Sequence, residues 1–472
     1  MAEMLRLDQV AFYYPQGRWG LEETSLTVTS GEGVLVTGPS GCGKSTFTRC
    51  LTGLIPHLYR GELRGEVWLG DHKTDKTPLW QLAEQAGLVF QNPAGQMLAE
   101  SVEDEIIFGL ENLGLTRPEV QARLEASLTR FGLQHMRHRS PQTLSGGEQQ
   151  KLALAAIIAR RPPVLVLDEP LSMLDSTAAI ELVDHLDHLV RSGTTVIVCE
   201  HRQEYLHGSP VFRDIPLGNG AHANRAKIDS IFQAVSRSSY QLEIKDLQVE
   251  RGGQRVIRDL SVSAQSGKVV ALVGRNGVGK TTLLRAMAGI QKYQGSILAR
   301  RSGSQAKPDF GMVFQNPDLQ LFNASVREEI LYRVPAPDIG YYEWLLEALG
   351  LVPYEETPPL LLSEGEKRRV ALATVLIRQP EHGILLDEPA LGQDAAHKEV
   401  LMDVVHALAK AGQLVVLATH DLELASQADQ LVLLGSDGIV AAGPPAELMG
   451  DDDLWERLGL LLPEWVRSRC GA

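Results

Sequence analysis

The stretch "VLVTGPSGCGKST", Val34 to Thr46, decides the fold of this chain. An apolar run leads into a glycine-rich turn, and the residues that follow, "TFTRCLTGL", have the pattern of a helix. The turn matches G-x-x-x-x-G-K-[ST], a loop whose backbone N–H groups curl around phosphates at a helix N-terminus. The sequence therefore predicts a nucleotide-binding loop between a strand and a helix.

The chain carries this loop twice. "ALVGRNGVGKTT", Ala271 to Thr282, repeats it, and the offset between copies shrinks from 236 at the lysines (280 − 44) to 219 at the histidines (420 − 201). A repeated order with shortened loops is what a duplicated domain produces. Three more segments recur in the same order: "LVFQNPAGQML" and "MVFQNPDLQLF", "VLVLDEPLSMLD" and "GILLDEPALGQD", and "VIVCEH" and "VVLATH".

Length and composition agree with two soluble globular domains. The 472 residues exceed one ordinary core, and 44% are hydrophobic and 22% charged. No apolar run reaches the roughly 18 residues of a membrane span, and the first residues lack the apolar core of a secretory signal. The four cysteines lack metal spacing, which favours a reduced cytosolic compartment. A net charge of −14 argues against a nucleic-acid scaffold.

Each copy alternates apolar β-branched runs with helical patterns, which predicts a largely parallel α/β sheet. After His201 the rhythm gives way to "HGSPVFRDIPLGNGAHANRAK", and the second copy restarts near Tyr240. We expect a first domain over 1–220, a linker over 221–238 and a second domain over 239–472.

Both loops carry the groups that hold a nucleotide. Lys44 and Lys280 are expected to reach the β- and γ-phosphates, and the Ser45 and Thr281 hydroxyls to bind Mg²⁺. The expected nucleotide-binding residues of the loops are Gly38, Pro39, Ser40, Gly41, Cys42, Gly43, Lys44, Ser45, Thr46, Gly274, Arg275, Asn276, Gly277, Val278, Gly279, Lys280, Thr281 and Thr282.

Two acids end a later apolar strand in each copy. In "VLVLDE" and "GILLDE", Asp168 and Asp387 fit the role of holding Mg²⁺ and its waters. The next residues, Glu169 and Glu388, stand where a carboxylate orients and deprotonates the attacking water. The sequence thus predicts nucleotide hydrolysis at two sites.

The segment "LSGGEQQ", Leu144 to Gln150, is absent from phosphate-loop proteins in general. It is the signature of ATP-binding cassette (ABC) ATPases, and with the other motifs it makes the chain resemble two fused ABC nucleotide-binding domains. The resemblance covers the chain except the join and the tail after about Leu448. It implies ATP and Mg²⁺ as ligands and two tandem P-loop NTPase domains. Each would have a RecA-like α/β core, an antiparallel β subdomain and an α-helical subdomain.

In this family two domains face head to tail, and each ATP lies between the phosphate loop of one and the signature of the other. The resemblance implies that a signature serine contacts the γ-phosphate, that a glutamine senses Mg²⁺ and the transport partner, and that a histidine contacts the γ-phosphate. The residues in these roles are Ser145 and Ser363, Gln91 and Gln315, and His201 and His420. The signature segments comprise Ser145, Gly146, Gly147, Glu148, Ser363, Glu364, Gly365 and Glu366.

A narrower resemblance concerns the segments after the glutamines. "VFQNPAGQMLAESVEDEIIFGLENLGL" and "VFQNPDLQLFNASVREEI" look like those of energy-coupling factor (ECF) ATPases, and "EHRQEY" is similar to the histidine loop of their fused form. The resemblance implies uptake of a vitamin, its precursor or a transition-metal ion. It also implies a peripheral position on the cytoplasmic face of the membrane, with coupling helices of integral membrane subunits docking near Gln91 and Gln315.

The two copies differ where adenine would stack. "AFYYPQG" offers Tyr13 and Tyr14, of which Tyr14 is preferred, although a tyrosine there could equally pack in the core. The second copy has Glu250 and Arg251 instead. A base platform, which contributes roughly 1 to 3 kcal/mol by analogy with nucleic-acid stacking, is therefore expected at the first site alone.

The signatures differ by Gly146 and Glu364. Two unit charges at about 5 Å and an effective dielectric of about 20 repel by roughly 3 kcal/mol, enough to weaken closure about a hundredfold. A Glu364 carboxylate turned to solvent or to Lys367 would cost less. We expect two ATP sites with unequal hydrolysis rates, both formed within one chain, the first closing less readily.

Two other functions fit a tandem cassette. A soluble ABC ATPase acting on ribosomes or DNA often carries a long charged helical arm, which the short join here does not provide. The fused ATPase of monosaccharide importers typically has a degenerate second loop, whereas Lys280 and Thr281 are intact. No nucleic-acid partner is expected.

Overall fold

The computed structural model describes residues 3–15, 19–39, 41–206, 209–218, 239–251, 254–463 and 466. The chain divides into two compact units, Met1–Leu174 with Ala178–Ala221, and Asp175–Thr177 with His222–Ala472. The expected linker 221–238 lies outside the described residues, as do Ser40 and Cys470.

A five-stranded parallel sheet forms the centre of the first unit, in the order β6-β7-β8-β3-β9. The central strands β3, β7 and β8 are apolar along their length because both faces of a parallel sheet are covered. The phosphate loop follows β3 and the first acid ends β7, so both lie at the carboxyl edge of the sheet. The strands are β3 (Gly33–Thr37), β6 (Ala86–Val89), β7 (Val164–Asp168), β8 (Thr195–Cys199) and β9 (Phe212–Pro216).

An antiparallel sheet, in the order β2-β1-β4-β5, packs in the same unit. Inward-facing residues of β1, such as Leu5, Leu7 and Phe12, are buried against the helix after the phosphate loop. The strands are β1 (Glu3–Tyr13), β2 (Trp19–Thr29), β4 (Glu62–Leu69) and β5 (His72–Lys73). The helices of this core are α1 (Lys44–Leu51), α2 (Leu54–His57), α3 (Leu79–Gln85) and α7 (Ser176–Arg191).

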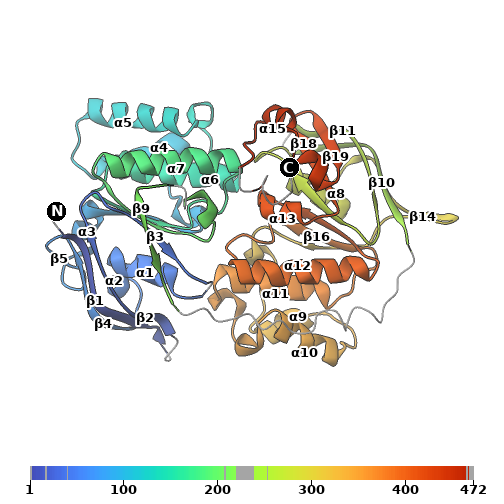
Figure 1. Cartoon of the computed structure of the whole chain (residues 1–472), viewed down its shortest axis with the longest axis horizontal. Helices are drawn as coiled ribbons and strands as arrows, with labels where there is room; N and C mark the ends of the chain where they lie inside the picture. Colours follow the sequence, from blue (N-terminus) through green and yellow to red (C-terminus); the bar gives the residue numbers. More distant parts are fainter. Residues whose placement is uncertain are drawn as a thin grey trace. The chain divides into compact units, whose positions relative to one another are not determined.

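Three helices make a separate layer of the first unit. They share an apolar core that includes Ile106, Leu128 and Leu152, all fully buried. In Figure 1, α4 and α5 lie on one side of β3 and β9, and the antiparallel sheet lies on the other. The helices are α4 (Val102–Glu111), α5 (Arg117–Arg130) and α6 (Gly146–Ala159).

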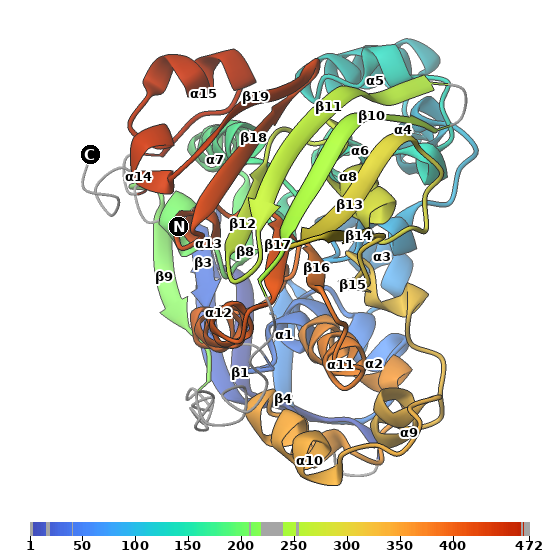
Figure 2. The ribbon, with the colours of Figure 1, turned by 90° about the vertical axis from the view of Figure 1, so that its right-hand side faces the viewer.

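The second unit repeats this plan. Its central sheet has the order β15-β16-β17-β12-β18-β19, parallel except for β19, and its antiparallel sheet has the order β11-β10-β13-β14. Figure 2 shows β10, β11 and β13 side by side. The strands are β10 (Gln241–Arg251), β11 (Gln254–Gln265), β12 (Val269–Val273), β13 (Gln294–Arg301), β14 (Ser304–Ala306), β15 (Phe310–Val313), β16 (Gly383–Asp387), β17 (Leu414–Ala418), β18 (Gln430–Gly435) and β19 (Gly438–Gly443).

The helices of the second unit fall into the same two groups. One group, α9 to α11, packs through Val326, Leu345 and Val370 into the large apolar core of the unit. The helices are α8 (Lys280–Met287), α9 (Val326–Leu331), α10 (Ile339–Ala348), α11 (Glu364–Leu376), α12 (Ala395–Lys410), α13 (Leu422–Ser426), α14 (Pro445–Leu448) and α15 (Asp452–Leu458). Of the described helices, none is long and apolar enough to cross a bilayer.

The predicted fold class is confirmed. The glycine- and proline-containing segment after His201, where the strand–helix rhythm of the sequence ends, includes β9, which lies within the first domain expected over 1–220 and runs parallel to β3 at the edge of the first sheet. Pro216 ends this strand, and an edge position tolerates proline because no further strand needs its missing N–H.

Candidate functional site

Both phosphate loops end in a glycine whose backbone is left-handed, a conformation that glycine adopts more readily than other residues. Gly43 has φ 97° and caps α1, and Gly279 has φ 104° and caps α8. A Cβ on Gly43 would lie 2.4 Å from the Gly20 carbonyl oxygen. The loops therefore turn sharply into their helices and leave the first helical N–H groups available to an anion.

The loop lysines are buried and fold back on their own loops. Lys44 Nζ donates to the carbonyl oxygens of Gly38 at 2.9 Å and Pro39 at 3.0 Å. Lys280 Nζ donates to Gly274 at 2.6 Å and to Arg275 at 3.2 Å. Neutral carbonyls balance a buried ammonium only partly, so phosphate oxygens are suited to replace them.

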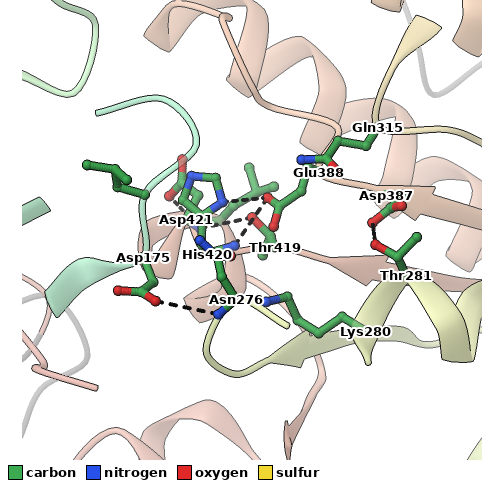
Figure 3. Close-up of polar contacts among 12 residues, drawn as sticks. Asp175, Asn276, Lys280, Thr281, Gln315, Asp387, Glu388, Thr419, His420 and Asp421 are labelled. Atoms are coloured by element: carbon green, nitrogen blue, oxygen red, sulfur yellow. Dashed lines mark hydrogen bonds and ion pairs between the residues drawn. The ribbon is translucent and has the colours of Figure 1, made fainter. Parts of the chain in front are cut away.

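The acids that end β7 and β16 fit Mg²⁺. Thr281 Oγ1 donates to Asp387 Oδ1 at 3.0 Å, which brings a loop hydroxyl and an acid together (Figure 3). Asp168 Oδ1 and Asp387 Oδ2 are buried and have no hydrogen-bond partner among the described residues. Burial and the neighbouring glutamate raise the pKa of Asp168 to about 7 and that of Asp387 to about 6. A divalent cation would supply the missing positive charge.

Each glutamate that follows lies against its histidine. Glu169 Oε1 is 3.3 Å from His201 Nε2, and Gln91 Nε2 donates to Glu169 Oε2 at 2.7 Å. Although burial opposes ionisation, His201, Lys44 and Gln91 lower the pKa of Glu169. The carboxylate is therefore charged and able to accept a proton from water.

The second copy repeats this arrangement through the other ring nitrogen. His420 Nδ1 is 2.8 Å from Glu388 Oε2, and Gln315 points its side chain towards Glu388 (Figure 3). Burial again opposes ionisation, and His420 and Lys280 lower the pKa of Glu388. In the same unit, the Asn276 N–H donates to Asp175 Oδ2 at 3.5 Å.

Both glutamates have a strained backbone, which the sequence did not reveal. Glu169 has φ 51° and Glu388 has φ 50°, in the left-handed region that non-glycine residues rarely occupy. Their N–H groups donate to the carbonyls of Cys199 and Ala418, both at 2.8 Å, on the next strand. The same φ recurs at two other equivalent pairs, Gln9 with Asp246 and Arg161 with Gln379, so it follows the repeated fold.

The signature segments begin helices. Ser145 and Ser363 are N-caps of α6 and α11, each in a capping box with the glutamate three residues later, Glu148 or Glu366. The pattern S-x-x-E in "SGGE" and "SEGE" is a sequence signal that could have predicted this box. It explains why the motif contains a glutamate at that position.

Glu364 turns to Lys367. It occupies the first position of α11, where an acid is favoured by the helix dipole, and its Oε1 lies 3.5 Å from Lys367 Nζ. The sequence left two orientations for this carboxylate, one facing the γ-phosphate and one turned to solvent or to Lys367. The structure has it turned to Lys367, the orientation with the smaller electrostatic cost.

Tyr14 lies beside the start of α1. Its hydroxyl is 3.1 Å from Thr46 Oγ1 and accepts from Arg49 Nη1 at 2.9 Å, while Tyr13 lies under the Arg64 guanidinium. The Tyr14 ring packs edge-on against Phe12 and borders the apolar core, as the packing interpretation expects. At the equivalent place in the second copy, Glu250 pairs with Arg255 on the surface.

Comparison with known proteins identifies the family. The ABC transporter family model matches residues 21–172 and 257–391, which together make up more than half of the chain. The chain therefore belongs to the ABC transporter family, whose ATP-binding subunits bind and hydrolyse ATP, usually with Mg²⁺.

Two curated relatives align with this chain over most of its length. YkoD of Bacillus subtilis, whose name provisionally describes an HMP/thiamine import ATP-binding protein, is 32% identical and covers 98% of this chain and 96% of its own. An ABC transporter ATP-binding protein, so named provisionally, from Treponema denticola is 32% identical over 92% and 96% of the two chains. The chain is thus similar over its whole length to proteins named for transport.

Solved structures show the same fold at lower identity. An archaeal ribosome recycling factor, in complex with a ribosomal stalk protein, matches with TM-score 0.63, 21% identity and coverage of 93% and 90%. An RNase-L inhibitor matches with TM-score 0.60 and 19% identity, covering 95% and 93%. At these identities the likeness concerns the fold alone.

Proposed function

We propose that this chain is the ATP-binding and ATP-hydrolysing subunit of a membrane importer, of the ECF type. It energises uptake of a vitamin, a vitamin precursor or a transition-metal ion from the cytoplasmic face of the membrane. The name of its relative YkoD favours HMP or thiamine among these solutes.

The observation that carries the proposal is a matched pair of exposed apolar side chains beyond the two glutamines. Leu98 in the first unit is 75% exposed and Phe322 in the second is 63% exposed. A single exposed apolar residue is ordinary, but one that recurs at the same position beside the glutamine loop of both copies supports a surface that binds another protein. Each lies seven residues after its glutamine, Gln91 or Gln315.

Buried glutamates hold these loops in place. Glu105 Oε2 accepts the N–H groups of Leu98 and Ala99, both at 2.8 Å. Glu329 Oε2 accepts those of Phe322 and Asn323, both at 2.7 Å. Because a buried carboxylate fixes the backbone in both copies, the apolar side chains are presented outward in the free protein. This preorganisation suits a surface that receives a coupling helix.

Hydrolysis would be conditional on closure of two composite sites. Each ATP would bind one phosphate loop and the signature serine of the other domain. The chain's own groups would position the γ-phosphate through Lys44 or Lys280 and orient water through Glu169 or Glu388. Bound Mg²⁺ would neutralise charge that develops on the phosphates. ATP binding would draw the domains together, and hydrolysis would release them, which a membrane subunit can convert into movement.

Isolation of the affinity-tagged full chain from detergent-solubilised membranes tests the proposal. Integral membrane proteins should co-purify with the wild type, and Leu98→Glu with Phe322→Glu should lose them while ATP binding persists. Val352→Glu, at a 52% exposed apolar residue of another segment, is the matched control and should retain them.

The rival function is action on ribosomes, the role for which one structural relative, the archaeal ribosome recycling factor, is named. Co-purification with ribosomal RNA and without membrane subunits would favour it. The net charge of −14 and the low identity of that relative speak against it. The identity of the co-purifying membrane proteins would distinguish the proposed function from that of the fused ATPase of a monosaccharide importer.

A further inference from the structure

Three consecutive cations, Lys367, Arg368 and Arg369, are buried in the signature helix of the second unit, and the first two hold neighbouring segments. Lys367 is 8% exposed and Arg368 is 6% exposed, both in the first two turns of α11. Buried cations are rare unless they are paired, so their partners indicate what they hold.

Lys367 ties α11 to the segment that follows Gln315. Its Nζ lies 2.8 Å from Asp318 Oδ1 and 3.5 Å from Glu364 Oε1. Asp318 belongs to a 3-10 turn, Pro317–Leu319. Although burial opposes the charge, Asp318 and Glu364 raise the pKa of Lys367. Lys367 therefore keeps its charge, and both Asp318 and Glu364 face it.

Arg368 reaches the residues around the candidate water-activating group. Its Nη1 donates to the Gln315 carbonyl at 2.7 Å and to the Glu388 carbonyl at 3.3 Å. One guanidinium thus bridges the helix capped by Ser363, the glutamine loop and the residue whose backbone has φ 50°.

The first copy lacks both links. Gln149 and Gln150 stand in place of the two cations, and Ala94 in place of Asp318. Gln149 Nε2 donates to the Pro141 carbonyl within its own segment, at 3.0 Å. The amide atoms of Gln150 are buried without a hydrogen-bond partner among the described residues. The first copy therefore serves as an internal comparison for the role of Lys367 and Arg368 in the second copy.

We propose that Lys367 and Arg368, with Asp318, are positioning residues of the second copy. They fasten the signature helix to the glutamine loop and to the backbone of Glu388, so that these three parts move as one. The first copy, with glutamines, moves its signature helix separately. The inference rests on the catalytic role proposed for Glu388, through which these residues act without contacting nucleotide.

The test is steady-state ATP hydrolysis by the full chain. Lys367→Gln and Arg368→Gln should each lower kcat about tenfold and leave KM within about twofold, because displaced groups act on the transition state rather than on ATP binding. Lys367→Arg should restore most of kcat. Arg378→Gln is the matched control: it removes another arginine that donates to a backbone carbonyl, that of Tyr332 at 2.6 Å, and should leave both constants unchanged.

A double-mutant cycle of Lys367→Gln with Asp318→Asn separates positioning from general destabilisation. The combined variant should lose no more kcat than either single variant, since each removes the same link. Additive losses, a rise in KM at unchanged kcat, or no rescue by Lys367→Arg would overturn the proposal. If Arg368→Gln fails to fold, Arg368→Met, which keeps an unbranched side chain without a hydrogen-bond donor, takes its place.

The role of Glu388 is tested separately by Glu388→Gln. Wild-type hydrolysis in that variant would refute the role of the glutamate, whereas the cycle between Lys367 and Asp318 would still report whether the link exists.

Discussion

The strained backbone of Glu388 predicts an inversion of the usual effect of glycine on stability. At most positions in regular structure, glycine is less stable than alanine by roughly 0.5 to 1 kcal/mol because it loses more freedom on folding. At Glu388, with φ 50°, we expect the Glu388→Gly variant to be more stable than Glu388→Ala. The same order is expected at Glu169, with φ 51°.

The magnitude follows from the difference between the two variants. Both lose the contact between Glu388 and His420, so that term cancels. A side chain in the left-handed region costs roughly 1 to 2 kcal/mol, against the smaller entropic cost of glycine. The net preference for glycine is about 1 kcal/mol, or about 2 to 4 °C in melting temperature for a domain of this size.

Thermal unfolding of the full chain without nucleotide measures this difference. The matched control is Asp403, an exposed residue inside helix α12, where alanine should be more stable than glycine in the ordinary way. Equal stability of the Glu388 variants, or higher stability of the alanine variant, would refute the strain. Neither variant should hydrolyse ATP at the second site, since each lacks the carboxylate.

Three further predictions concern other residues. Gly43→Ala should destabilise the first unit more than Gly279→Ala destabilises the second, by calorimetry, because the added Cβ meets a backbone carbonyl at 2.4 Å in the first case and a valine methyl at 3.2 Å in the second. Burial lowers the pKa of His185 to about 4, so the folded state loses stability as pH falls below the unfolded pKa of about 6.5. The His185→Leu variant should lose less unfolding free energy than the wild type between pH 6.5 and 4, as measured by urea unfolding. Glu169→Gln and Glu388→Gln should lose single-turnover hydrolysis unequally, and equal losses would contradict unequal sites.

The sequence predicted at which strand ends the residues of the candidate site lie. A parallel sheet places the carboxyl ends of its strands at one edge, so a loop after β3 and an acid after β7 had to lie together. Motif order alone therefore located Lys44, Asp168 and Glu169 within one region. Duplication of the order located the second region.

Local backbone geometry could not be predicted from the sequence. The left-handed φ of Glu169 accompanies a hydrogen bond from its N–H to the Cys199 carbonyl on the next strand, which is a tertiary contact. Strand β9 was missed because "FRDIP" lacks apolar alternation, and it pairs only through the neighbouring β3.

The environment of Glu364 could be predicted only in part. Its spacing of three residues from Lys367 on a helix predicts a contact, and the structure has it. Asp318, the stronger partner of Lys367, is 49 residues earlier and could not be paired from spacing. Because Lys367 faces the Glu364 carboxylate, the repulsion expected between Glu364 and a γ-phosphate is reduced.

The central claim is that one chain holds two ATP sites. The number of ATP molecules bound at saturation to the Glu169→Gln/Glu388→Gln double variant, measured by equilibrium dialysis with Mg²⁺, tests it most directly. Two ATP molecules per chain are predicted, because both phosphate loops keep their lysine, hydroxyl and acid. A saturating value of one or fewer per chain would contradict the claim.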